Sequence, residues 1–132
     1  MRRFRIQTPL GRAAGLGSAR SGFGHWWAER ITAVALVPLS AWFAACLIAQ
    51  RGSDYDAFRN WLGAPVNTLC MMLLLIALFW HAALGLQVVI EDYVHSGAKI
   101  WLVVATRLAC FAVASTGILA TLRIAFETWG TT

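Results

Sequence analysis

Residues 66–90 read VNTLCMMLLLIALFWHAALGLQVVI, a run of 25 residues without a charged side chain. As an α-helix this run is about 37 Å long, enough to cross a hydrocarbon core of ~30 Å with some tilt. Pro65 comes directly before it and suits the first turn of a helix, where its missing N–H costs no hydrogen bond. The run therefore predicts a transmembrane helix.

The rest of the chain is also rich in apolar residues. Of the 132 residues, 59% are hydrophobic and only 13% are charged, and the mean hydropathy is +0.64. A second uncharged run covers residues 31–49, and a third covers residues 100–122, interrupted only by Arg107. We expect Arg107 to snorkel toward the nearer membrane edge. Pro38 lies within the first run, where a kink is possible.

These runs predict an all-α integral membrane protein with three transmembrane helices, at about 31–49, 66–90 and 100–122. They would form an anchor domain over residues 28–128, preceded by a basic segment over residues 1–27. The connector QRGSDYDAFRN (50–60) has the composition of a loop, and EDYVHSGAK (91–99) is a shorter one in which Gly97 suits a helix C-terminus.

The charge distribution predicts the direction of the helices. Six arginines and one glutamate give the first thirty residues a charge of +5, whereas the remaining five basic and five acidic residues cancel. Under the positive-inside rule the N-terminus is cytoplasmic, and three crossings place the C-terminus on the periplasmic side. The connector 91–99 would then face the cytoplasm.

Two other kinds of protein fit the composition poorly. The arginines suit nucleic-acid binding, but seven tryptophans and three long apolar runs argue against it, so no nucleic-acid partner is expected. Cys46, Cys70 and Cys110 each stand alone in an apolar run, so they predict small buried side chains rather than a zinc or iron–sulfur site.

His81 is the candidate functional residue of the middle helix. It lies ten residues, about 15 Å, from Glu91 at the membrane edge, and hence near the midplane of the bilayer. An ionisable group at this depth is costly and points to a function, although a neutral imidazole hydrogen-bonded to another helix is the structural alternative. Ala77 and Gly85 share its helix face and leave room for a flat macrocycle such as haem. Close packing of helices explains the same two small residues equally well.

A second axial ligand for haem is missing from this chain. The other two histidines, His25 and His95, lie outside the hydrophobic core, and Met71 and Met72 are on the same helix as His81. If the haem is six-coordinate, another chain must supply the opposite ligand. His81 would then be one half of a shared site.

Four residues near the cytoplasmic edge complete the candidate site. Arg30 and His25 could contact haem propionates, since the guanidinium fork pairs with carboxylates; the alternatives are a headgroup anchor and an interfacial histidine. Tyr93 could donate a hydrogen bond to a quinone carbonyl, and Asp92 could orient that tyrosine or relay protons. The alternative for this pair is an interfacial aromatic and a helix-end charge, but an acid at a helix C-terminus opposes the dipole.

The segments SGFGHWWAERITAVALVPLSAW (21–42) and HAALGLQVVIEDYVH (81–95) resemble the small hydrophobic membrane anchor of succinate dehydrogenase, respiratory complex II. The resemblance covers about residues 21–125. It implies a multi-pass protein of the cell inner membrane that pairs with a second membrane anchor subunit. It also implies an iron–sulfur subunit and a flavoprotein subunit docked on the cytoplasmic side, with membrane lipid around the helices.

The resemblance also implies roles for individual residues. His81 corresponds to the axial ligand of a haem b shared with the partner anchor. Tyr93 corresponds to the tyrosine that contacts ubiquinone, and Asp92 to the acid beside it. Arg30 corresponds to the arginine near the propionates and the quinone, with His25 as a further propionate contact.

Three functions remain open at this point. The first is an electron-transfer anchor, which does not itself oxidise succinate because the chain has no flavin or cluster motif. The second is a small transporter or channel subunit, in which His81 and Asp92 would conduct protons. The third is a haemless structural anchor, in which His81 serves packing alone.

Overall fold

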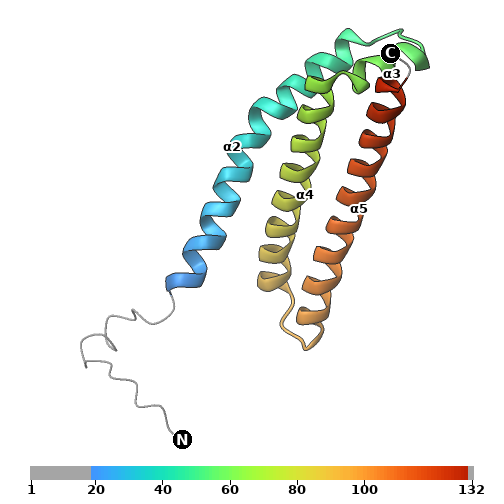
Figure 1. The fold of residues 1–132 in the computed structure, drawn as a ribbon. Helices are drawn as coiled ribbons and strands as arrows, with labels where there is room; N and C mark the ends of the chain where they lie inside the picture. Colours follow the sequence, from blue (N-terminus) through green and yellow to red (C-terminus); the bar gives the residue numbers. More distant parts are fainter. Residues whose placement is uncertain (1–18, 131–132) are drawn as a thin grey trace, which may run out of the picture.

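The computed structural model describes residues 19–130, with side chains from residue 23 onward, and all four elements in that range are α-helices. They are α2 (Ala19–Ala49), α3 (Tyr55–Gly63), α4 (Pro65–Tyr93) and α5 (Ala98–Trp129) (Figure 1). Most of the basic segment predicted for residues 1–27 lies outside the described residues, and so do Arg2, Arg3, Arg5 and Arg12.

Three of these helices are long and apolar enough to cross a membrane: Phe23–Ala49, Pro65–Tyr93 and Ala98–Trp129. The prediction of a three-span, all-helical membrane protein is therefore confirmed. Each helix extends beyond its apolar run, because hydropathy marks the part of a helix that suits lipid and the backbone hydrogen bonds continue past it. As a result Asp92 and Tyr93 belong to the last turn of α4, not to a loop.

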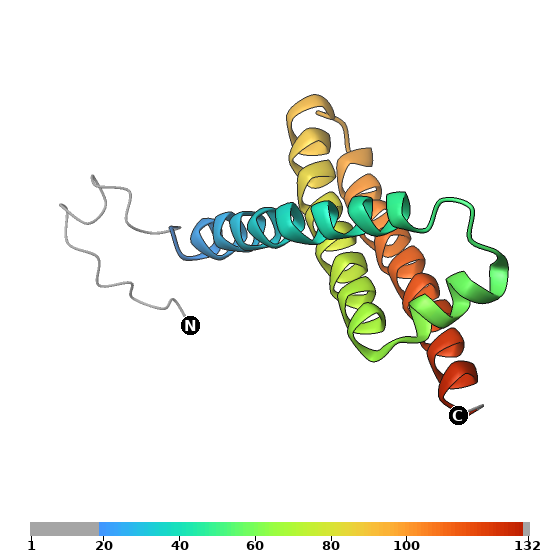
Figure 2. The same ribbon diagram turned by 90° about the horizontal axis from the view of Figure 1, so that it is seen from above.

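Helix α4 is the centre of the bundle, since α2, α3 and α5 all pack against it, whereas α2 has no described contact with α5. Helices α4 and α5 form an antiparallel pair (Figure 1). Figure 2 shows α2 crossing over this pair, with its N-terminal half extending away from both helices. Helices α2 and α4 pack against each other where they cross.

The connector 50–60, which the sequence predicts to be a loop, is helical over its second half. After a turn at Gly52, which has a φ of 86°, Asp54 begins α3 by accepting a hydrogen bond of 2.8 Å from the backbone N–H of Ala57. This is an ordinary N-cap. Packing stabilises this helix. Leu62 is buried, and the ring of Trp61 stacks on Trp42 of α2 at a centroid distance of 6.0 Å.

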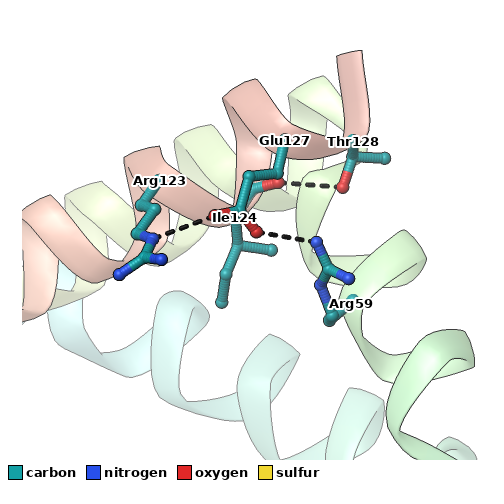
Figure 3. Close-up of polar contacts among 5 residues, drawn as sticks. All are labelled: Arg59, Arg123, Ile124, Glu127 and Thr128. Atoms are coloured by element: carbon teal, nitrogen blue, oxygen red, sulfur yellow. Dashed lines mark hydrogen bonds and ion pairs between the residues drawn. The ribbon is translucent and has the colours of Figure 1, made fainter. Parts of the chain in front are cut away.

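Polar contacts fasten α3 to the end of α5. Glu127 accepts from Arg59 of α3 at 2.7 Å and from Arg123 of its own helix at 2.9 Å, as Figure 3 shows. The indole N–H of Trp129 donates to the carbonyl of Gly63 at 2.7 Å. Helix α3 therefore lies at the membrane edge opposite to the one where α4 ends.

The connector between α4 and α5 is short and differs from the prediction in one detail. Val94 is the C-cap of α4, and Gly97 precedes the first residue of α5 with ordinary helical dihedral angles. Gly97 therefore begins α5 and does not end α4.

Candidate functional site

His81 lies on the side of α4 that meets α2. Its side chain is half-buried, and its Nδ1 atom is 3.1 Å from Oγ1 of Thr32 on α2. This contact is the hydrogen bond between helices that the packing alternative for His81 requires. It is equally what a histidine ligand shows, since metal-bound imidazoles almost always engage their second nitrogen with a protein group.

The small residues on either side of His81 have different environments. Ala77 is buried, with 8% of its surface exposed, so its size serves packing within this chain. A Cβ atom placed on Gly85 would meet no described atom within 4 Å. The space beside Gly85 is therefore open in this chain, about one helical turn along α4 from the imidazole.

His25 shares a face of α2 with Thr32, since the two are seven residues apart. The Nε2 atom of His25 is buried and has no hydrogen-bond partner among the described residues. A buried polar atom without a partner is costly, and in native proteins it commonly awaits a water or a ligand. Arg30, by contrast, is exposed, and its guanidinium lies over the ring of Trp26 at 5.3 Å.

Asp92 and Tyr93 are both exposed at the end of α4, and 81% of the Tyr93 side chain is accessible. No described residue hydrogen-bonds to either side chain. They lie about 16–18 Å along the helix from His81 at 1.5 Å per residue. The structure therefore places the two quinone candidates together and leaves them apart from His81.

A polar chain that the sequence analysis did not foresee links α4 to α5 at the same end. Arg107 donates to the side-chain carbonyl of Gln87, and Gln87 donates to the Glu91 carboxylate at 2.7 Å. Lys99 donates to the backbone carbonyl of Glu91 at 3.1 Å. Arg107 thus bonds to an amide side chain of the neighbouring helix α4, and its snorkelling toward a membrane edge stays a prediction. The spacing of Gln87 and Glu91 by four residues was the available signal.

The described residues contain no group of three or more His, Cys, Asp or Glu side chains that could hold a metal ion. A haem would need fewer ligands from this chain, because the porphyrin supplies four nitrogens and each axial position takes a single ligand. His81 fits one axial position, and the unpartnered nitrogen of His25 fits a propionate. The residues present are therefore compatible with one side of a haem site.

A hollow of about 480 Å³ lies between α4 and α5, lined mainly by apolar side chains that include Trp80 and Phe111. His81 is not among its lining residues. The hollow is therefore separate from the candidate site.

Comparison with known proteins identifies the family. The family described as succinate dehydrogenase/fumarate reductase transmembrane subunit matches residues 5–114. No solved structure matches.

Several curated relatives share one printed name, succinate dehydrogenase hydrophobic membrane anchor subunit. The protein of Rickettsia bellii (strain RML369-C) is 41% identical over 83 residues, covering 63% of this chain and 66% of that protein. The protein of Rickettsia conorii (strain ATCC VR-613 / Malish 7) is 31% identical, covering 75% of this chain and 80% of that protein. The protein of Paracoccus denitrificans is 33% identical, covering 72% and 74%. This chain belongs to the family of succinate dehydrogenase/fumarate reductase transmembrane subunits, and it is a multi-pass membrane protein.

Proposed function

We propose that this chain is the membrane anchor subunit of a succinate:quinone oxidoreductase in the cell inner membrane. It docks the flavoprotein and iron–sulfur subunits on the cytoplasmic side and pairs with a second anchor subunit. The family and the names of the relatives support the complex. The charge of +5 over the first thirty residues supports a cytoplasmic N-terminus and a periplasmic C-terminus.

One observation carries the haem part of the proposal. His81 is held from the α2 side through Nδ1, while the Gly85 turn beside it is open. His81 would be one axial ligand of a haem b, and the second anchor would supply the other. When bound, haem b stores and passes one electron at a time. The buried Nε2 of His25 would donate to a propionate, and Arg30 would pair with a propionate or approach the quinone.

The end of α4 would form part of the ubiquinone site. The Tyr93 hydroxyl can donate a hydrogen bond to a quinone carbonyl, and this stabilises the negative charge that develops on the oxygen during reduction. The Asp92 carboxylate adjoins it and can hold the proton that the reduced oxygen needs. Both side chains are exposed in this chain and lack described partners, so they are available to a quinone bound between subunits.

A haemless structural anchor is the second candidate, because the Thr32 contact satisfies His81 without a ligand. A reduced-minus-oxidised absorption spectrum of the tagged, co-purified complex separates the two. We expect a b-type signal in the wild type and in His95→Ala, whose histidine is exposed in the α4–α5 connector, and its loss in His81→Ala. A flavoprotein that co-purifies without any haem signal would support the haemless anchor. If neither a flavoprotein nor a haem signal were found, the transporter or channel subunit would be the remaining alternative.

A further inference from the structure

The hydroxyl of Thr32 has one proton to donate, and three polar atoms lie within hydrogen-bonding distance of it. Its Oγ1 lies 2.8 Å from the carbonyl of Ala28 and 3.0 Å from that of Glu29, and 3.1 Å from Nδ1 of His81. Both carbonyl oxygens are acceptors only, so the hydroxyl proton points toward them, as is usual for threonine within a helix. Toward His81 the hydroxyl therefore presents a lone pair.

The protonation of the imidazole follows from this arrangement. A lone pair on Oγ1 at 3.1 Å is matched only by an N–H on Nδ1. If Nδ1 instead carried a lone pair, two acceptors would face each other, or Thr32 would have to give up its bond to the Ala28 carbonyl. A neutral imidazole carries one proton, so Nε2 is left with the lone pair.

We propose that Thr32 is a positioning residue which selects the Nδ1–H tautomer of His81 and thereby leaves Nε2 ready to bind iron. The proposal rests on the haem role of His81 given above. Thr32 also restrains the rotation of the ring, because it holds one nitrogen against α2. An imidazole in the opposite tautomer would have to move its proton before it could bind the metal.

The contact couples the haem ligand to the position of α2. Helix α2 crosses and packs against α4 (Figure 2), and the contact between Thr32 and His81 joins the two helices. The hydroxyl orients the imidazole without placing a charge beside it, unlike a carboxylate partner, which would raise the basicity of the ligand. We therefore expect loss of the hydroxyl to change both haem retention and haem potential.

The first test reads the tautomer directly, without haem. The full chain carries only three histidines, so nitrogen NMR of ¹⁵N-histidine-labelled protein is assignable with His25→Gln and His95→Gln. We expect the neutral His81 ring to show a protonated Nδ1 and an unprotonated Nε2 in the wild type, and a mixture of tautomers in Thr32→Val. A wild-type ring protonated on Nε2 would overturn the proposal.

The second test uses the assembled complex. In Thr32→Val we expect a haem affinity lower by about tenfold, a shifted midpoint potential and an altered ferric electron paramagnetic resonance signal. Thr32→Ser, which keeps the hydroxyl, should restore all three. Thr116→Val is the matched control, since Thr116 makes the same bond within its helix, to the carbonyl of Ala112 at 2.8 Å, on an exposed face of α5.

The outcomes separate this proposal from the proposed function. Wild-type haem content, potential and resonance signal in Thr32→Val would overturn the role of Thr32 even if His81→Ala lost haem. If His81→Ala retained haem, the axial-ligand assignment itself would fail.

Discussion

Gly63 on α3 and Thr128 on α5 lie so close that a Cβ atom on Gly63 would come 2.5 Å from Oγ1 and 2.7 Å from Cβ of Thr128. The threonine cannot easily turn away, because its hydroxyl donates to the carbonyl of Ile124 at 2.8 Å (Figure 3). Glycine at position 63 is therefore a requirement of the α3–α5 contact.

Gly63→Ala should destabilise the folded chain by roughly 1–3 kcal/mol, the usual cost of overpacking. Thermal unfolding of the complex in detergent would measure the change. The control is Gly24→Ala, because a Cβ atom there meets no described atom within 4 Å. An equal melting temperature for the two variants would contradict the described packing of α3 on α5.

Thr68→Val should cost about 1–3 kcal/mol, because the shape is kept and a buried hydrogen bond is lost. Thr68 is only 4% exposed, and its hydroxyl donates to the carbonyl of Leu62 at 2.7 Å, across the junction between α3 and α4. Thr116→Val is again the control, since its hydroxyl bond is exposed and lies within one helix. Chemical denaturation should show a clearly larger loss of stability in Thr68→Val than in Thr116→Val.

Arg59→Met should lower the melting temperature more than Arg123→Met, although both arginines pair with Glu127. The Arg59 side chain is 29% exposed and joins two helices, whereas the Arg123 side chain is 82% exposed and pairs within α5. Exposed pairs of the second kind contribute little to stability. High salt should reduce the difference between the variants, and a larger loss in Arg123→Met would contradict this ranking.

Gly85→Leu should leave the fold of this chain intact and weaken assembly on the open side of α4. Ala77→Leu, on the same face but buried, should instead lower the stability of the chain itself. We expect the haem content per anchor subunit to fall about tenfold or more in Gly85→Leu, because the free-energy cost of overpacking lowers the affinity for haem. Full haem content in Gly85→Leu would show that the site does not extend over this turn.

Tyr93→Phe should reduce succinate-dependent ubiquinone reduction by roughly tenfold to a hundredfold, while reduction of a soluble dye by the flavoprotein is unchanged. The chain has only one other tyrosine, Tyr55, which is exposed on α3 near the other membrane edge. Tyr55→Phe is therefore a matched control that should keep full activity. Equal quinone turnover in both variants would remove Tyr93 from the site.

The sequence was enough to predict the three spans, because a long uncharged run has one stable conformation in a bilayer. It was not enough for α3, which is short and polar on one side. This helix is stabilised by the Asp54 cap, by packing on α4 and α5, and by the stacking of Trp61 on Trp42 of α2. The position of His81 near the middle of the second span was also predictable from counting residues. Its contact with Thr32 was not, since 49 residues separate the two and the crossing of α2 over α4 determines which side chains meet.

The bond between Arg107 and Gln87 bears on how the chain is made. Synthesis proceeds from the N-terminus, so α4 leaves the ribosome first, and Gln87 is already available when Arg107 arrives at the translocon. The cost of inserting α5 with its arginine is then shared by the helix that precedes it. If the two helices came in the reverse order, the arginine would enter the membrane before its amide partner had been synthesised.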